Sequence, residues 1–197
     1  MTSFVIMVKT GDGVRDGYAA HPDGAEGWYR DNGASYRNPH EDAVGDVLAL
    51  AVKWWPTVFA GQVLDLSCGS GEATLALRAA GVAAERIEGC DPYTADAFAE
   101  RVGRPMQSWS FADIAGGVLE GRRYSGIVCS YALHLCEPSR LAPVCLALAG
   151  ASPALVIVTP HKRPEIGPEH GWDLIDDHRD ISLRVRLRLY ESNQKSR

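Results

Sequence analysis

The most constraining feature of this chain is an alternation of two hydrophobic patterns that begins at residue 62. Short apolar runs rich in Val, Ile and Leu alternate with segments whose apolar residues recur three and four positions apart. The first pattern predicts buried strands, and the second predicts helices with one apolar face. Because right-handed crossovers place helices on both faces of a parallel sheet, the alternation predicts an α/β fold with one doubly wound, mostly parallel sheet.

The alternation also predicts where the elements lie. Five parallel strands are expected at residues 62–66, 86–90, 106–109, 126–130 and 154–159. Helices are expected between them at residues 72–80, 95–102, 114–120 and 139–149. Near the C-terminus, residues 183–190 alternate Leu or Val with Arg, a period of two that predicts one more strand.

The first 37 residues are rich in Gly, Asp and Tyr and carry little periodicity, which predicts an irregular N-terminal arm or lid with one short strand at residues 4–8. A helix is expected next, with Asn38 as its N-cap, Pro39 at its first position and Pro56 after its end near Trp55. Its apolar stripe comprises Val44, Val47, Leu48, Ala51 and Trp55. We therefore expect a single domain at residues 1–197, with an arm at residues 1–37 and a core at residues 38–197.

Length and charge exclude several classes of protein. At 197 residues, with 46% hydrophobic and 23% charged residues, the chain fits one globular domain and neither a disordered nor a collagen-like protein. The 20 Lys and Arg against 25 Asp and Glu give a net charge of −5, which argues against a protein whose main task is binding nucleic acid. No apolar run reaches the roughly 18 to 20 residues of a membrane span.

Cysteine usage and the N-terminus bear on the compartment and on metal binding. The N-terminus has no signal-peptide pattern, and the five cysteines form no CxxC pair, so we expect a cytoplasmic protein. Cys129, His134, Cys136 and Cys145 fall within one stretch, but their spacing matches no common zinc site. Packing of the cysteines in the core is the favoured interpretation, and no metal is expected.

Residues 63–72 are the segment most informative about chemistry, because a buried strand runs there into a loop of small residues and then a helix. Gly69 and Gly71 have no Cβ to block a ligand from the backbone, although a bare strand-to-helix turn also favours glycine. Asp91 follows Gly71 by 20 residues, at the end of the second strand. A nucleotide site places an acid there to bind ribose hydroxyls; a role in the turn or as an N-cap is the alternative.

The charges around this loop distinguish two classes of cofactor. A dinucleotide site prefers a third glycine and a helix N-terminus without acidic neighbours, whereas here Thr74 takes the glycine position and Asp65 and Glu72 flank the loop. Two carboxylates would repel a pyrophosphate. They suit a cofactor with an ammonium and a sulfonium group, which describes S-adenosylmethionine.

With these motifs the chain resembles the class I S-adenosylmethionine-dependent methyltransferases over roughly residues 28–191. The segment DLSCGSG at residues 65–71 resembles the first motif of the family, with Ser67 where its first glycine usually lies. Asp91 is similar to the ribose-binding acid, and residues 111–114 resemble the segment whose acid meets the adenine amino group. The resemblance implies a Rossmann-like fold with seven strands, including a short strand at residues 172–175 that pairs with the antiparallel strand at 183–190.

The resemblance also implies the residues that bind the cofactor S-adenosylmethionine and its product S-adenosylhomocysteine. The implied cofactor-binding residues are Asp65, Ser67, Gly69, Gly71, Asp91, Pro92, Asp113, Ile114, Ser130 and Tyr36. For Asp113, a role as a helix cap is the alternative.

The site of the methyl acceptor is expected at the same edge of the sheet. Residues 129–135 resemble the fourth motif of the family and place His134 after the fourth strand, where it can act as general base or only pack. The polar loop after the fifth strand carries His161. The arm contributes aromatic and hydrogen-bonding residues that either close over the cofactor or pack on the sheet. The expected substrate-binding residues are Tyr29, Arg37, His40 and His161.

The sequence therefore predicts a methyltransferase that transfers a methyl group to an O, N or S nucleophile. A small-molecule acceptor is favoured because no substantial domain is inserted in the minimal fold. One alternative is a methyltransferase-like domain that binds a ligand or partner without catalysis. A less favoured alternative is a nicotinamide-dependent oxidoreductase, which would need the missing glycine.

Overall fold

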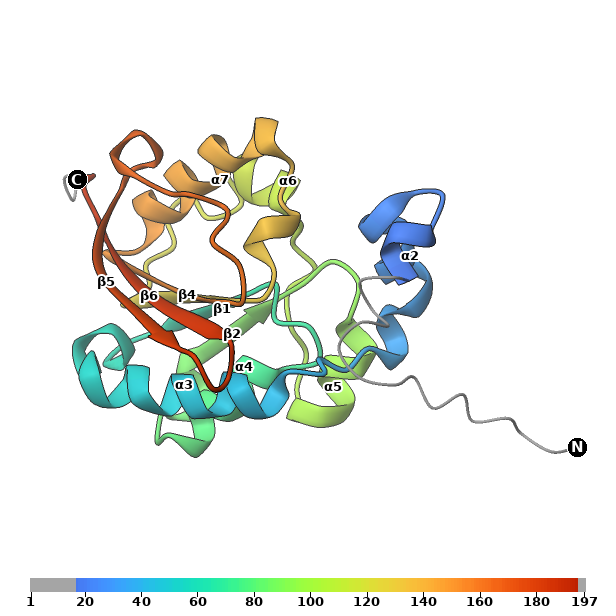
Figure 1. Cartoon of the computed structure of the whole chain (residues 1–197), viewed down its shortest axis with the longest axis horizontal. Helices are drawn as coiled ribbons and strands as arrows, with labels where there is room; N and C mark the ends of the chain where they lie inside the picture. The colour runs from blue at the N-terminus through green and yellow to red at the C-terminus, as the bar shows by residue number, and fades with distance from the viewer. Residues whose placement is uncertain (1–16, 195–197) are drawn as a thin grey trace, which may run out of the picture.

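The computed structural model describes residues 17–194 (Figure 1). The strand expected at residues 4–8 lies outside the described residues. The chain forms a six-stranded sheet in the order β2-β1-β3-β4-β6-β5. The strands are β1 Val63–Leu66, β2 Ile87–Cys90, β3 Gly126–Ser130, β4 Ala154–Thr159, β5 Trp172–Asp180 and β6 Val185–Ser192. The first four strands pair in parallel, and β6 is antiparallel to both β4 and β5.

The prediction of a strand at residues 106–109 is wrong. The described sheet has six strands, four of them parallel, where seven strands with five parallel were expected. Only Gln107 pairs with the sheet, through an isolated bridge to Cys90. Its N–H donates to the Gly89 carbonyl at 2.9 Å, and its carbonyl accepts from the Asp91 N–H at 3.0 Å. Pro105 has no N–H to extend this pairing, which favours a single bridge at the sheet edge. The strand expected at residues 172–175 is longer and runs from Trp172 to Asp180.

Helices pack against both sides of the strands (Figure 1). The α-helices are α2 Gly24–Asn32, α3 Glu41–Trp54, α4 Glu72–Ala79, α5 Ala95–Val102, α6 Phe111–Ala115 and α7 Pro138–Ala151. Short 3₁₀ helices are η1 Gly33–Ser35, η2 Pro56–Phe59, η3 Ala84–Arg86, η4 Leu133–Leu135 and η5 Pro168–His170. Alternate residues of the strands point to two core clusters, one shared with α6 and α7 and the other with α3 and α4. The sheet is therefore packed on both faces, and the carboxyl ends of its parallel strands lie between these two layers of helices.

Two helix boundaries differ from the expected ones because of local hydrogen bonds. The helix α3 begins at Glu41, so Asn38 is not its N-cap; the Asn38 side chain instead accepts from the His40 N–H at 2.9 Å. The helix expected at residues 114–120 lies at Phe111–Ala115, because Ser110 and Asp113 form a capping box at its start. The apolar stripe of α3 is confirmed at Val44, Val47, Leu48 and Ala51, all fully buried.

No helix among residues 17–194 combines the length and the apolar character that crossing a membrane requires.

Candidate active site

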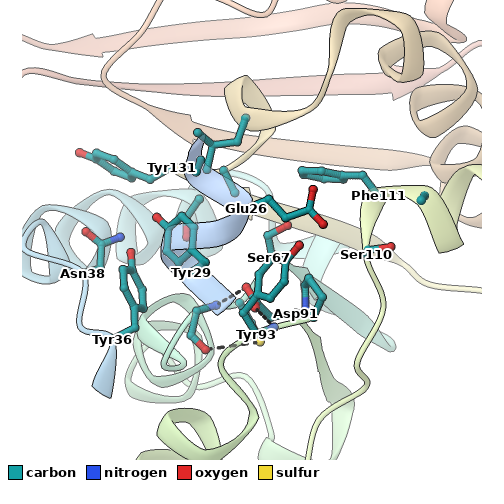
Figure 2. A pocket seen from close by; sticks show the side chains of 18 of the residues that line it. Glu26, Tyr29, Tyr36, Asn38, Ser67, Asp91, Tyr93, Ser110, Phe111 and Tyr131 are labelled. Atoms are coloured by element: carbon teal, nitrogen blue, oxygen red, sulfur yellow. Dashed lines mark hydrogen bonds between the residues drawn. The ribbon is translucent and has the colours of Figure 1, made fainter. Parts of the chain in front are cut away.

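A cavity of about 200 Å³ opens at the carboxyl ends of β1, β2 and β3, beneath α2 (Figure 2). In an open α/β sheet this edge is where ligands bind. The lining residues are Ala25, Glu26, Tyr29, Tyr36, Asn38, Ser67, Cys68, Gly69, Glu72, Asp91, Pro92, Tyr93, Ser110, Phe111, Ala112, Ser130, Tyr131, Ala132, Leu135, Glu137 and Arg140. The structure thus brings together six of the expected cofactor-binding residues: Tyr36, Ser67, Gly69, Asp91, Pro92 and Ser130.

The loop after β1 approaches the cavity with two residues in the left-handed region. Ser67 has a φ of 54° and Gly69 a φ of 55°. A Cβ on Gly69 would lie 2.8 Å from Cε1 of Tyr36, so a side chain there would displace the arm. Ser67 adopts this conformation although it has a Cβ, at a position where glycine would be unstrained. The absence of a side chain at Gly69 is therefore what lets the arm close against the loop.

Gly71 has a different role from the cofactor contact expected of it. It does not line the cavity, and with a φ of 93° it caps α4. A Cβ at Gly71 would lie 2.3 Å from Cγ2 of Val102 on α5. Gly71 is thus required by the packing of α5 against the loop.

Asp91 is positioned in the cavity wall by backbone N–H groups from both neighbouring loops. Its Oδ1 accepts from the Tyr93 N–H at 2.9 Å, and its Oδ2 accepts from the Gly69 N–H at 3.3 Å. Burial raises the pKa of the Asp91 carboxyl, and the bonds from Tyr93, Thr94 and Gly69 act in the opposite direction. The carboxylate also lines the cavity, where it can accept from a ligand hydroxyl. Asp91 therefore both shapes the turn and presents a carboxylate to the cavity.

Asp65, expected to bind the cofactor, lies behind the loop and outside the cavity wall. It is fully buried, and its Oδ2 accepts from the Thr74 hydroxyl at 2.6 Å. Burial raises the pKa of the Asp65 carboxyl to about 7, against the lowering effect of the Thr74 hydrogen bond. The structure gives Asp65 a role in holding β1 to α4.

This raised pKa predicts a pH-dependent stability. In the unfolded chain the pKa of an aspartate is about 3.9, so folding disfavours the ionised form of Asp65. Its contribution to the free energy of unfolding is lost as the pH rises from about 4 to about 7. We expect Asp65→Asn, which cannot ionise and can still accept from Thr74, to be more stable relative to wild type at pH 8 than at pH 5, by about 1 kcal/mol or more.

Urea unfolding of both proteins at the two pH values measures this difference. Equal differences at pH 5 and pH 8 would show that Asp65 does not titrate in this range.

The segment at residues 111–114 reaches the cavity through other residues than expected. Phe111 and Ala112 line the cavity together with Ser110, whereas Asp113 and Ile114 do not. The Asp113 carboxylate accepts from the Ser110 hydroxyl at 2.6 Å and from the Ser110 N–H at 2.8 Å, and these two bonds lower its pKa. Ile114 is fully buried in the core. Ser110 is thus the N-cap of α6, and Asp113 completes its capping box three residues later.

The arm contributes an aromatic cluster. Tyr29 and Tyr36 line the cavity with ring centroids 5.3 Å apart, and Tyr29 also stacks on Tyr93 at 6.4 Å. Burial raises the pKa of Tyr29 to about 12, so its phenol is neutral at physiological pH. Figure 2 shows Tyr29 and Glu26 of α2 reaching between Tyr36 on one side and Phe111 on the other. The arm therefore covers the cavity with neutral aromatic rings.

The other expected substrate-binding residues lie outside the cavity wall. Arg37 donates to Glu100 at 3.3 Å, and His40 stacks on Tyr131 with ring centroids 4.9 Å apart. His161 packs against His134 at 4.6 Å, and neither histidine is in the cavity wall. The structure thus brings the two histidines together, and it places them beside the cavity.

Several residues of the cavity wall were missed from the sequence. Glu26 lines the cavity because of where α2 lies, and residues 17–37 carry no sequence pattern that predicts this position; Tyr93 lies in the loop after β2. Tyr131 had a usable signal, because it follows β3 directly; its φ of 54° is one of three positive values at described non-glycine residues, two of which line the cavity. Glu72 was recognised only as an acidic flank of the loop.

The charges of the wall limit the ligands that the cavity can hold. It carries the carboxylates of Glu26, Glu72, Asp91 and Glu137, and Arg140 is its only basic side chain among the described residues. Rings of tyrosine and phenylalanine form much of the remainder. An acidic and aromatic wall suits a ligand with a cationic group and a flat ring, and it disfavours a polyanion. Within residues 17–194, no three His, Cys, Asp or Glu side chains are grouped so that they could hold a metal ion.

The chain is similar in sequence to a protein of fission yeast and in fold to solved methyltransferases. The uncharacterized protein C17A5.05c of Schizosaccharomyces pombe is 31% identical over 229 aligned positions, which cover 91% of this chain and 92% of that protein. No family model matches the chain. Magnesium protoporphyrin IX methyltransferase (ChlM) of Synechocystis PCC 6803, solved with bound SAM, has a TM-score of 0.58 and 16% identity, covering 91% of this chain and 95% of ChlM. The N-methyltransferase NodS of Bradyrhizobium japonicum WM9, in complex with S-adenosyl-L-homocysteine, has a TM-score of 0.58 and 10% identity, covering 83% of this chain and 96% of NodS.

Proposed function

Because the chain belongs to the same family as the S. pombe protein C17A5.05c and has the fold of class I S-adenosylmethionine-dependent methyltransferases, we propose that it is an S-adenosylmethionine-dependent methyltransferase. The proposal rests on one observation. The cavity at the carboxyl ends of β1, β2 and β3 joins the Gly69 loop, the Asp91 carboxylate and the aromatic arm in one wall.

The residues of the wall fit this cofactor. Asp91 offers its carboxylate to ribose hydroxyls, and Phe111 offers an apolar ring for an adenine. Tyr36 and Tyr29 present neutral rings that attract a sulfonium by its charge. When bound, S-adenosylmethionine supplies an electrophilic methyl group, and its transfer leaves S-adenosylhomocysteine.

The protein contributes binding, orientation and exclusion of water. Tyr29 and Glu26 of α2 cover the cavity, so a ligand beneath them is shielded from solvent. Methyl transfer needs little covalent help, because most of the gain comes from holding the nucleophile in line with the methyl group. A base at His134 stays a prediction from the sequence, because His134 packs against His161 and lies outside the cavity wall.

The size and charge of the cavity favour a small-molecule acceptor with an O, N or S nucleophile. The space is about 200 Å³, and α2 covers it. Arg140 alone among the described lining residues could bind a phosphate, which disfavours a nucleic acid.

Calorimetry with S-adenosylhomocysteine tests the proposal. We expect it to bind, and we expect Asp91→Ala to weaken binding by about 10- to 100-fold because two charge-assisted hydrogen bonds to the ribose are lost. Asp96→Ala on the exposed side of α5 is the matched control, and its affinity should equal that of wild type.

Two further ligands separate the alternatives. Binding of NAD in place of S-adenosylhomocysteine would indicate an oxidoreductase and contradict the proposal. A protein that binds S-adenosylhomocysteine but transfers no label from S-adenosyl-[methyl-³H]methionine to a panel of small phenols, amines and thiols would fit the binding domain without catalysis.

A further inference from the structure

The two carboxylate oxygens of Glu72, the first residue of α4, differ in their hydrogen bonding. The side chain is 3% exposed and lies in the cavity wall. Its Oε1 accepts from the Asn38 N–H at 3.0 Å, from Nη1 of Arg101 at 3.1 Å and from the Ser70 hydroxyl. Three donors on one oxygen fix the orientation of the carboxylate.

The second oxygen of Glu72, Oε2, faces the ligand side of the loop. Within residues 17–194 no donor hydrogen-bonds to it. A Cβ on Gly69 would lie 3.1 Å from this oxygen and 2.8 Å from Cε1 of Tyr36, so Oε2 and the Tyr36 ring both lie against the Gly69 backbone. Figure 2 shows Tyr36 and Asn38 on the same side of the cavity. Oε2 therefore has no partner from the described part of the protein, and a cation bound in the cavity would supply one.

The charge around Glu72 stays negative despite its ion pair. Arg101 binds Glu72 with Nη1 and Glu41 with Nη2, so one guanidinium serves two carboxylates. Two carboxylates and one guanidinium leave one net negative charge in this cluster. A cation at Oε2 would therefore meet a cluster with a net negative charge.

We propose that Oε2 of Glu72 binds a cationic group of the cofactor, with Arg101 as the positioning residue that fixes Oε1. This inference rests on the proposed function. S-adenosylmethionine carries two such groups, the ammonium and the sulfonium, which share the chemistry that a carboxylate next to an aromatic ring recognises.

Three probes test the inference on Glu72→Gln. S-adenosylmethionine carries both cations, S-adenosylhomocysteine carries only the ammonium, and 5′-methylthioadenosine carries neither. We expect the variant to bind 5′-methylthioadenosine as wild type does and to bind S-adenosylmethionine about 10- to 100-fold more weakly, because a hydrogen bond between two charged groups is lost. An equal loss for S-adenosylhomocysteine identifies the ammonium, and no loss for it identifies the sulfonium.

The outcomes separate the inference from the proposed function. Equal losses for all three probes, or no loss for any, would overturn the role of Glu72 as a cation ligand. If wild type binds none of the three, the proposed function itself fails. Circular dichroism and the unfolding midpoint check that the variant folds, and a probe that still binds the variant reports an intact cavity.

Variants of Arg101 test its positioning role without changing the cavity wall. We expect Arg101→Met to lower the ratio of the S-adenosylmethionine and 5′-methylthioadenosine affinities about tenfold, and Arg101→Lys to restore much of this ratio. Asp96→Asn, which removes an exposed carboxylate from the same helix, is the matched control and should leave the ratio unchanged. A purely structural role of Arg101 would weaken all probes alike, and that result would overturn the positioning role.

Discussion

Gly69→Val is expected to reduce the affinity for S-adenosylhomocysteine by about 100-fold or more, because the new side chain displaces groups that each contribute about 1 to 3 kcal/mol to binding. The first atom of that side chain would lie 2.8 Å from the Tyr36 ring and 3.1 Å from Oε2 of Glu72. The arm would be pushed from the loop, and the branched side chain would occupy part of the ligand space. Calorimetry measures the loss.

Gly81→Val is the matched control for the backbone. Gly81 also has a positive φ, of 97°, but a Cβ there would meet nothing within 4 Å. Both variants carry the strain of a side chain in the left-handed region, about 1 to 2 kcal/mol, and Gly69→Val adds the clash with the arm. Gly81→Val should bind S-adenosylhomocysteine as wild type does. Wild-type affinity in Gly69→Val would show that the ligand does not approach this loop.

Gly71→Ala is expected to act on stability, lowering the free energy of unfolding by about 2 to 5 kcal/mol. Its Cβ would lie 2.3 Å from Cγ2 of Val102 and 3.3 Å from the ring of Phe98, and the φ of 93° adds strain. Phe98 is fully buried and cannot move aside without disturbing the core. Urea unfolding measures the loss.

A double variant separates the clash from the strain. In Gly71→Ala with Val102→Ala, the nearest atom is removed, so the double variant should be less destabilised than the sum of the two single variants. Simple additivity would mean that Val102 is not the cause. Because Gly71 lies outside the cavity wall, the folded fraction of Gly71→Ala should bind S-adenosylhomocysteine more tightly than Gly69→Val does.

The two glycines show how far a motif can be interpreted from sequence. Both occur in a loop that resembles a cofactor-binding motif, and from sequence both were expected to admit a ligand. The structure assigns Gly69 to the cavity and the arm, and Gly71 to the packing of α5. The distinction depends on which element lies over each Cα, and the spacing of the residues carries no information on that.

Asp65 and Glu72 show the same limit for charge. In the sequence both are acidic residues that flank the loop, and nothing in their spacing separates their roles. Tertiary packing buries Asp65 against Thr74 and turns Glu72 to the cavity wall, where Arg101 arrives from α5 and Asn38 from the segment before α3. Partners that are distant in sequence decided which carboxylate faces the ligand.

The sequence by itself determined the parallel strands β1 to β4, the apolar stripe of α3 and the position of Asp91, because periodicity and spacing along the chain report local structure and burial directly. Only the tertiary structure decided that the segment at residues 106–109 makes a single bridge, that α2 covers the cavity, and that His134 lies against His161 beside it. These features depend on contacts between segments far apart in the chain. A local pattern of residues reports burial and secondary structure, but it does not report which distant segment packs against it.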